Sequence, residues 1–173
     1  MKKDLSYNQV PENMERVQRI LKHPEFETSM SAIRALEKER IFCCHGIAHL
    51  LDVARIAYIM SLEEEAGLKK DMIYAAGLLH DVGKYLQYMN GTPHHISSAE
   101  MGERILADAG YDADEITVIS YAIRSHRDQK AAGEERLSWI LYRADKLSRA
   151  CYACPVSSEC NWSEEKKTTG VIS

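Results

Sequence analysis

Hydrophobic residues recur along the chain with the three-to-four residue spacing of amphipathic helices, and the alternation typical of half-buried strands is almost absent. The spacing predicts helices over 11–22, 30–42, 47–61, 71–79, 97–109, 112–123 and 134–149. The segment 72–79 is the most apolar, so we expect it to form the central buried helix. The predicted fold class is therefore all-α, a bundle of about six to seven helices.

The chain shows no internal repeat and no linker long enough to separate two domains. Asp112 followed by Glu115 resembles a capping box at the start of one helix, and Gly110 is a typical stop signal for the helix before it. We expect a single helical domain over 1–162 that includes a C-terminal cysteine motif. The polar residues 163–173 are predicted to be a loosely held tail.

Composition narrows the class of partner. The chain has 173 residues, and 22 Lys and Arg against 26 Asp and Glu leave a net charge of −4, which lacks the basic footprint of nucleic-acid binders. No apolar run is long enough to cross a bilayer, and Met1-Lys2-Lys3 leads into polar residues instead of an apolar signal core. We therefore predict a cytoplasmic protein whose partners include neither nucleic acid nor a membrane.

The first candidate functional residues follow the most apolar predicted helix, in the sequence His80-Asp81-Val82-Gly83-Lys84. Burying charge is costly unless the charge is paired or bound to metal, and imidazole beside carboxylate suits a divalent transition ion. The alternative for His80 and Asp81 is a hydrogen-bonded pair at the end of a helix.

Two further segments extend this pattern. His49 precedes Val53-Ala54 by four residues, and Asp145 follows Ala144 far downstream of Asp81. The series H…HD…D, centred on 75–84, resembles the HD superfamily of metal-dependent phosphohydrolases over 47–149. This resemblance implies an all-α bundle in which one metal is held by His49, His80, Asp81 and Asp145.

The chain also resembles the subset of that superfamily that binds two metals. His94 or His95, together with His126, occupies the matching positions, and the resemblance favours His94. It implies that Asp81 bridges two divalent ions, with iron or manganese favoured, and that a shared water attacks the substrate. His45 lies four residues before His49 and is either another ligand or, as we favour, a supporting or capping residue.

Basic residues surround the proposed ligands and suggest an anionic substrate. Lys84 follows Asp81 by three residues, so we expect these two as catalytic residues, with Lys84 also contacting substrate phosphate. Further predicted substrate contacts are Arg124, Arg127 and Lys146, with Arg143 nearby. The alternative for each cation is solvated surface.

Cysteines form a second motif. Cys151, Cys154 and Cys160 lie within ten residues, and Cys43-Cys44 precede His49. We expect Cys151, Cys154, Cys160 and Cys44, or Cys43 in its place, to hold zinc or an iron–sulfur cluster. The alternative is reduced thiols packed as small hydrophobes.

The expected function is hydrolysis of a nucleotide or other small phosphate ester or anhydride by a metal-bound water. Related patterns include a bacterial enzyme that cleaves dinucleoside tetraphosphates symmetrically, which suggests a similar substrate. Two alternatives remain open: an oxygenase with a mixed-valent diiron centre, and a non-enzymatic nucleotide or redox sensor. Whether the chain forms a homodimer is also open.

Overall fold

The computed structural model describes residues 11–171, which form helices, turns and loops with no strand among them. This confirms the predicted all-α class. The α-helices are α1 (Glu15–Leu21), α2 (Pro24–Leu36), α3 (Ile47–Glu63), α4 (Lys70–Leu79), α5 (Lys84–Asn90), α6 (His94–Ala109), α7 (Ala113–Ser125), α8 (Gln129–Ala132) and α9 (Arg136–Leu147). Single 3-10 turns occur at η1 (Glu12–Met14), η2 (Cys151–Ala153), η3 (Ser157–Glu159) and η4 (Glu164–Lys166).

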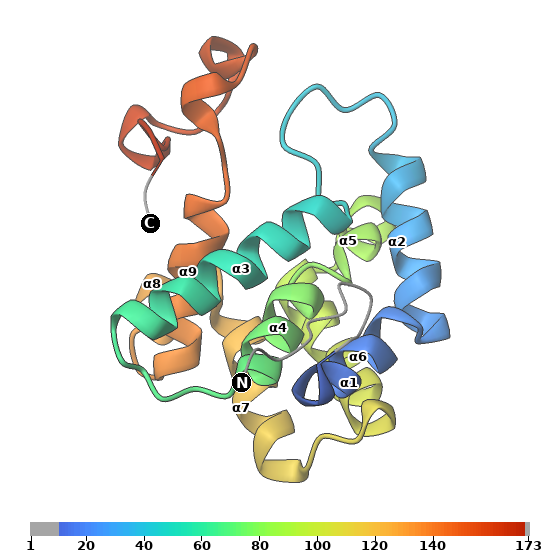
Figure 1. Cartoon of the computed structure of the whole chain (residues 1–173). Coiled ribbons are helices and arrows are strands. Elements are labelled where there is room, and N and C mark those ends of the chain that lie inside the picture. The colour runs from blue at the N-terminus through green and yellow to red at the C-terminus, as the bar shows by residue number, and fades with distance from the viewer. Residues whose placement is uncertain (1–10, 172–173) are drawn as a thin grey trace.

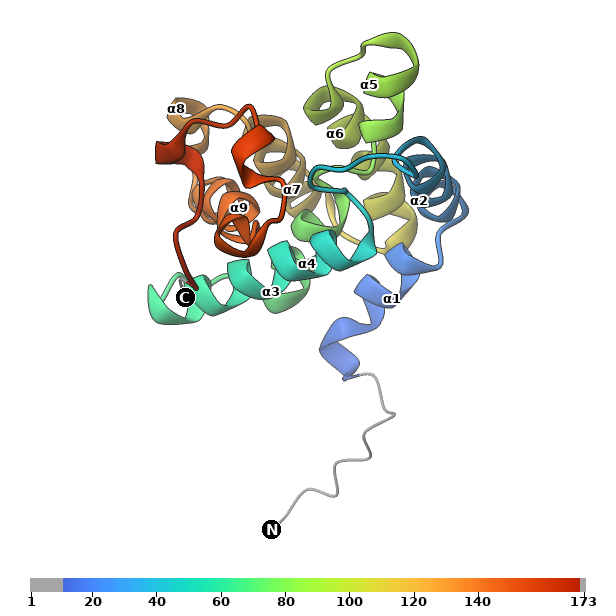
Figure 2. The ribbon, with the colours of Figure 1, turned by 90° about the horizontal axis from the view of Figure 1, so that it is seen from above.

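Helix α4 lies at the centre of the bundle and packs against α3 and α7, as its apolar sequence predicts (Figures 1 and 2). Helix α9 packs on both α3 and α7, and α6 packs on α7. The approach of α3 to α4 is unusually close because Gly77 faces Ala54: a Cβ atom at Gly77 would lie 2.7 Å from the Ala54 Cα. This packing brings the start of α3 and the end of α4 to one side of the core.

Several helix boundaries differ from the prediction. Helix α2 begins at Pro24, where the His23 side chain caps its first turn, and ends at Leu36, so 37–46 forms a loop and not a helical extension. Helices α5 and α8 were not predicted, because α5 contains no buried residue and α8 is only four residues long. Neither carries the apolar stripe on which the prediction depended, which is why the bundle has more helices than expected.

The turn between α4 and α5 is held directly against α6. Gly83 N donates a hydrogen bond of 2.9 Å to Ser98 Oγ, and a Cβ atom at Gly83 would lie 2.6 Å from Ser98 N. Glycine is therefore required for this contact, which fixes the position of the preceding His80-Asp81 pair relative to α6.

The segment that follows α9 projects from the same side of the bundle as the loop 37–46 (Figure 1), and residues of both line one cavity. Thr168 is buried, accepts a hydrogen bond of 3.1 Å from Cys151 N and donates one to Arg149 O. Lys167 Nζ donates to Ser157 O at 2.7 Å. Within 163–171, Lys167 and Thr168 are thus hydrogen-bonded to the segment that follows α9. Among the helices of the described residues, none combines the length and apolar character needed to cross a membrane.

Candidate metal centre

His80 and Asp81 lie immediately after α4, where the helix ends inside the core. His80 is fully buried and its Nδ1 donates a hydrogen bond of 2.8 Å to Gly77 O, which leaves Nε2 as the acceptor atom facing the site. Within the described residues, His80 Nε2 and Asp81 Oδ1 are buried atoms with no hydrogen-bond partner. Two orphaned polar atoms at one buried point fit a site for a cation, because burial without a partner is costly.

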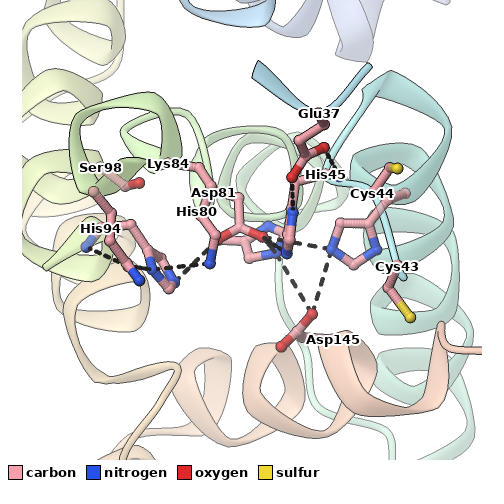
Figure 3. A network of polar contacts seen from close by, with 12 residues as sticks. Glu37, Cys43, Cys44, His45, His80, Asp81, Lys84, His94, Ser98 and Asp145 are labelled. Atoms are coloured by element: carbon pink, nitrogen blue, oxygen red, sulfur yellow. Dashed lines mark hydrogen bonds and ion pairs between the residues drawn. The ribbon is translucent and has the colours of Figure 1, made fainter. Parts of the chain in front are cut away.

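The first group of ligand atoms comes from three helices. His49 lies in the first turn of α3 and Asp145 in the last turn of α9, and both offer a ligand atom close to the His80-Asp81 turn. Figure 3 shows Asp145 below Asp81. Asp81 Oδ2 lies 3.2 Å from His80 Nε2 and 3.6 Å from His49 Nε2. Asp145 Oδ1 lies 3.4 Å from His49 Nε2 and 3.7 Å from His80 Nε2. The atoms are therefore spaced to surround one ion.

A second group uses the other oxygen of Asp81. His94, the first residue of α6, places Nε2 3.2 Å from Asp81 Oδ1, and His126 after α7 places Nε2 3.9 Å from the same oxygen. His126 Nδ1 donates to Ile123 O at 2.6 Å, which again leaves Nε2 free to bind metal. The structure brings His94, and not His95, into this group. Asp81 thus stands between two sites, one facing each oxygen.

Electrostatics support a cationic occupant. Burial opposes ionisation of Asp81, but His80 and His49 outweigh it and keep the pKa of Asp81 well below its usual range. Burial lowers the pKa of His94 to about 3 and that of His126 to about 4. His94 and His126 are therefore held in the neutral form that metal ligands need. Burial also lowers the pKa of His80, but Asp81 and Asp145 outweigh it and raise that pKa to about 10, so a bound metal ion would have to displace a proton from His80.

His45 lies beside these groups without belonging to either. It is buried, its Nδ1 contacts Glu37 Oε1 at 2.5 Å, and its Nε2 lies 4.0 Å from Asp81 Oδ2. Tyr88 Oη donates to the same Glu37 oxygen at 2.6 Å. Burial raises the pKa of Glu37, but the hydrogen bonds from His45 and Tyr88 lower it to about 2, so this carboxylate holds the imidazole in place.

A cavity of about 600 Å³ opens over the two groups. Four basic residues line it, namely Arg40, Lys84, Arg127 and Arg149. Arg149 Nη2 lies 3.0 Å from Asp145 Oδ1 and 3.2 Å from His49 Nε2. The cavity therefore combines metal ligands with side chains suited to an anionic substrate.

Three predicted cations lie elsewhere. Arg124 pairs with Glu103 at 3.7 Å, and Lys146 places Nζ 3.4 Å from the centre of the Tyr142 ring. Arg143 pairs with Glu64. None of them lines the cavity, so the structure does not support Arg124 and Lys146 as substrate contacts. Their helical positions beside His126 and Asp145 turn them away, because adjacent residues on a helix face different directions.

The five cysteines do not all line the same cavity. Cys43, Cys151 and Cys160 line it, whereas Cys44 lines a separate depression beside Glu37 and Ile47. All five thiols are free, and no three of their sulfur atoms lie within 4.8 Å of one another in the part of the chain that is described. The expectation that Cys44 completes the cysteine site is therefore not supported, since Cys43 is the member of the pair that faces Cys151 and Cys160.

Sequence analysis missed several residues of the site, among them Arg149, Arg40 and Glu37. Arg149 carried a usable signal, because it follows Asp145 by four residues and so shares its helical face. Arg40 and Glu37 lie in or beside a loop without periodicity, and only the fold brings them to the cavity and to His45.

This chain matches one family model and is similar in sequence to several known proteins. The HD domain family model matches residues 46–150. An uncharacterized protein of Clostridium beijerinckii is 47% identical over 89% of this chain and 96% of its own length. The putative phosphohydrolase YueE of Bacillus subtilis is 29% identical over 59% of this chain and 65% of its own.

A longer enzyme and a solved structure are also similar to this chain. Ribonuclease Y of Lawsonia intracellularis is 30% identical over 74% of this chain, which corresponds to only 22% of that enzyme. The crystal structure of a predicted HD superfamily hydrolase from an uncultured Thermotogales bacterium aligns with a TM-score of 0.59 and 25% identity, covering 87% of this chain and 86% of the other. With the family model matching more than half of the chain and the ligand geometry present, this protein belongs to the HD domain family of metal-dependent phosphohydrolases.

Proposed function

We propose that this protein hydrolyses a nucleotide or another small phosphate ester or anhydride, with a dinucleoside polyphosphate as one candidate. The observation that carries the proposal is Asp81, which offers one oxygen to each of two ligand groups at the floor of a basic cavity. Two adjacent ions with open faces are the arrangement used for displacement at phosphorus.

The ligands have distinct tasks in this arrangement. His49, His80, Asp81 and Asp145 would hold one divalent ion, and Asp81, His94 and His126 the second, with iron or manganese as the favoured metals. Ions bound there would polarise the phosphoryl oxygens and lower the pKa of a water. His80 and His126 keep their Nε2 atoms aimed inward through backbone hydrogen bonds at Nδ1.

Cations at the cavity wall would bind the phosphate oxygens that face away from the ions. Lys84 is half-buried, and its Nζ lies 3.2 Å from His94 Nδ1. Burial lowers the pKa of Lys84, although Asp81 opposes this effect. Arg127 also lines the cavity. Together they offer hydrogen-bond donors to the charge that develops in phosphoryl transfer.

The remaining wall suits a nucleoside. Phe42 and Trp162 line the cavity from two different segments and provide aromatic surface for stacking a base, and Asn161 adds an amide for hydrogen bonding. The volume of about 600 Å³ falls within the range of small-molecule sites. Some relatives are named ribonuclease Y, which implies RNA as their substrate. The net charge of −4 favours a small substrate for this chain, because binding of an RNA backbone depends on basic residues.

The test uses the purified chain loaded with iron or manganese under anaerobic conditions. A panel of mononucleotides, dinucleoside tetraphosphates, 4-nitrophenyl phosphate and a short RNA is assayed for product. We expect Asp81→Asn to reduce hydrolysis by more than ~100-fold, beyond the effect typical of outer-shell changes, and to reduce bound metal. His95→Asn, which alters a histidine outside both groups, should change neither.

Two results would overturn the proposal. The first is hydrolysis that survives Asp81→Asn, and the second is turnover of no phosphorylated substrate together with metal-dependent oxygen uptake. The second result would favour the diiron oxygenase alternative.

A further inference from the structure

Arg149 follows the last turn of α9 and is buried, which is an uncommon place for a guanidinium group. It lies four residues after Asp145 and therefore on the same side of the helix. Its backbone is fixed from both directions, because Arg149 N donates to Lys146 O at 3.2 Å and Arg149 O accepts from Cys151 N at 2.9 Å. Arg149 O also accepts a hydrogen bond from Thr168 Oγ1. The side chain is thus held at a fixed point beside the first group of ligand atoms.

The guanidinium group of Arg149 has more donors than its protein partners use. Its Nη2 lies 3.0 Å from Asp145 Oδ1 and 3.2 Å from His49 Nε2. Among the described residues, Arg149 Nε is a buried atom without a hydrogen-bond partner. A guanidinium group carries five N–H donors, and a buried donor without a partner is costly. Because Arg149 lines the cavity, an anion that enters there could satisfy these donors.

The contact with Arg149 defines the protonation of His49. A guanidinium nitrogen can only donate, so His49 Nε2 is the acceptor. The other ring nitrogen agrees with this: Ser148 Oγ donates to Asp145 O at 2.7 Å and lies 3.3 Å from His49 Nδ1, which therefore donates to the hydroxyl oxygen. The lone pair on His49 Nε2 is the one that a metal ion in the first group would use.

Arg149 and a metal ion therefore compete for the same atoms. His49 Nε2 and Asp145 Oδ1, the two atoms that Arg149 Nη2 contacts, both belong to residues of the first ligand group. One nitrogen lone pair cannot accept a hydrogen bond and bind a metal at the same time. The positive charges of the ion and of the guanidinium group also repel each other at such short range. Metal binding in the first group should consequently release Arg149 from His49.

We propose that Arg149 binds the phosphate group of the substrate, and that it becomes free to do so when a metal ion replaces it at His49. This inference rests on the proposed function and adds a phosphate-binding residue to it. Guanidinium groups suit the task, because their planar fork donates two parallel hydrogen bonds to phosphate oxygens.

The position of Arg149 complements that of the other cations. Lys84 Nζ lies beside His94 of the second ligand group, whereas Arg149 lies beside His49 and Asp145 of the first. A phosphate group above the two ions would therefore meet a cationic side chain at each end of the site. Since the release of Arg149 depends on the first ion, phosphate and metal should bind cooperatively.

The first experiment titrates Mn²⁺ into full-length protein that has been stripped of metal, with calorimetric detection. Arg149→Met removes the donors and keeps an apolar stem. We expect one Mn²⁺ to bind about 10-fold more tightly in this variant, because a charged hydrogen bond no longer competes for His49 Nε2. Mn²⁺ binding that is equal or weaker in Arg149→Met would overturn the competition.

Arg40→Met is the matched control for this titration. Arg40 lines the same cavity, but its Nε donates to Cys43 O at 2.9 Å, and it contacts no ligand atom. Removing its charge should change Mn²⁺ affinity by less than about 3-fold, because the charge lies in an open, screened cavity. If Arg40→Met tightened Mn²⁺ binding as much as Arg149→Met, net charge would explain both results and the competition would be refuted.

The second experiment titrates inorganic phosphate into the Mn²⁺-loaded proteins. We expect Arg149→Met to bind phosphate about 10-fold or more weakly, and Arg149→Lys, which keeps the charge without the planar fork, to lie between the two. In the hydrolysis assay, the KM for the best substrate of the panel should rise by a similar factor. Unchanged phosphate affinity in Arg149→Met would rule out Arg149 as a phosphate-binding residue.

Thermal unfolding establishes that the variants remain folded. Should Arg149→Met fail to fold, Arg149→Lys takes its place in both titrations, and Mn²⁺ and phosphate affinities equal to those of the unmodified protein would then contradict the proposal. If both binding results hold but no phosphorylated compound is hydrolysed, the proposed function fails and the role of Arg149 in metal and phosphate binding stands.

Discussion

Replacing Gly77 by alanine tests how closely the fold must hold α3 against α4. A Cβ atom at this position would lie 2.7 Å from both the Cα and the Cβ of Ala54 and 2.9 Å from its nitrogen. Carbon atoms in contact normally stand about 3.5 to 4.0 Å apart. The two helices would therefore have to separate by roughly 1 Å, because the opposing atoms are mostly backbone and cannot rotate away.

The magnitude follows from two opposing effects. Overpacking of this kind costs about 1 to 3 kcal/mol, while alanine gains about 1 kcal/mol over glycine in helix propensity. We expect Gly77→Ala to lower the free energy of unfolding by up to about 2 kcal/mol, or up to several degrees in Tm. Because His49 lies on α3 and His80 follows α4, the same displacement should weaken metal binding at the first group.

Gly102→Ala is the matched control. Its Cβ atom would meet Ile123 Cδ1 at 3.3 Å, the end of a side chain that can shift, so the propensity gain should be retained. Urea unfolding of both variants and metal content per chain provide the comparison. If Gly77→Ala were as stable as Gly102→Ala and bound as much metal, the close approach of α3 and α4 would not govern the site.

Two further predictions concern carboxylates outside the metal ligands. The hydrogen bond from Arg16 lowers the pKa of Glu115 from 4.5 to about 2. The ionised Glu115 therefore stabilises the fold fully above pH 4.5, and this stabilisation is lost as the pH falls toward 2. Glu115→Gln should cost roughly 2 to 3 kcal/mol at pH 7 and little at pH 2, measured by urea unfolding at both pH values. Glu37→Gln should lower kcat about 10-fold or more, because Glu37 holds His45 beside Asp81; steady-state kinetics equal to those of the unmodified protein would exclude this positioning role.

Helices that bury an apolar stripe could be predicted from the sequence. Helices without a buried stripe could not. The apolar run of 72–79 identified α4, and the Asp112 and Glu115 capping box marks the start of α7 in the structure. Helix α5 has no buried residue, and its start depends on the Gly83 contact with Ser98, which involves residues distant in sequence. Local pattern carries no information about such contacts.

The candidate site, too, could be predicted only in part. Residue types and the resemblance to a known family indicated the histidines and aspartates and favoured His94 over His95, and the structure brings His94 into the second group of ligand atoms. The positions of Arg40 and Cys43 depend on the path of the loop 37–46, which has no regular period. The sequence alone indicated which chemistry is available, and the fold determines which copy of each residue type takes part.

The boundaries of the family match divide the cavity into two parts. Residues 46–150 supply all the proposed His and Asp ligands, so the metal chemistry belongs to the part shared with the HD family. Arg40, Phe42, Cys43, Cys160 and Trp162 line the outer wall and lie outside that range. Lys84 and Arg127 within the family match would bind phosphate, so selectivity for the rest of a substrate should reside in the flanking segments, which add aromatic and thiol side chains to the cavity. Exchanging 151–162 for a short polar linker should relax discrimination among phosphate esters while metal binding at Asp81 persists; loss of both together would show that the two parts are not separable.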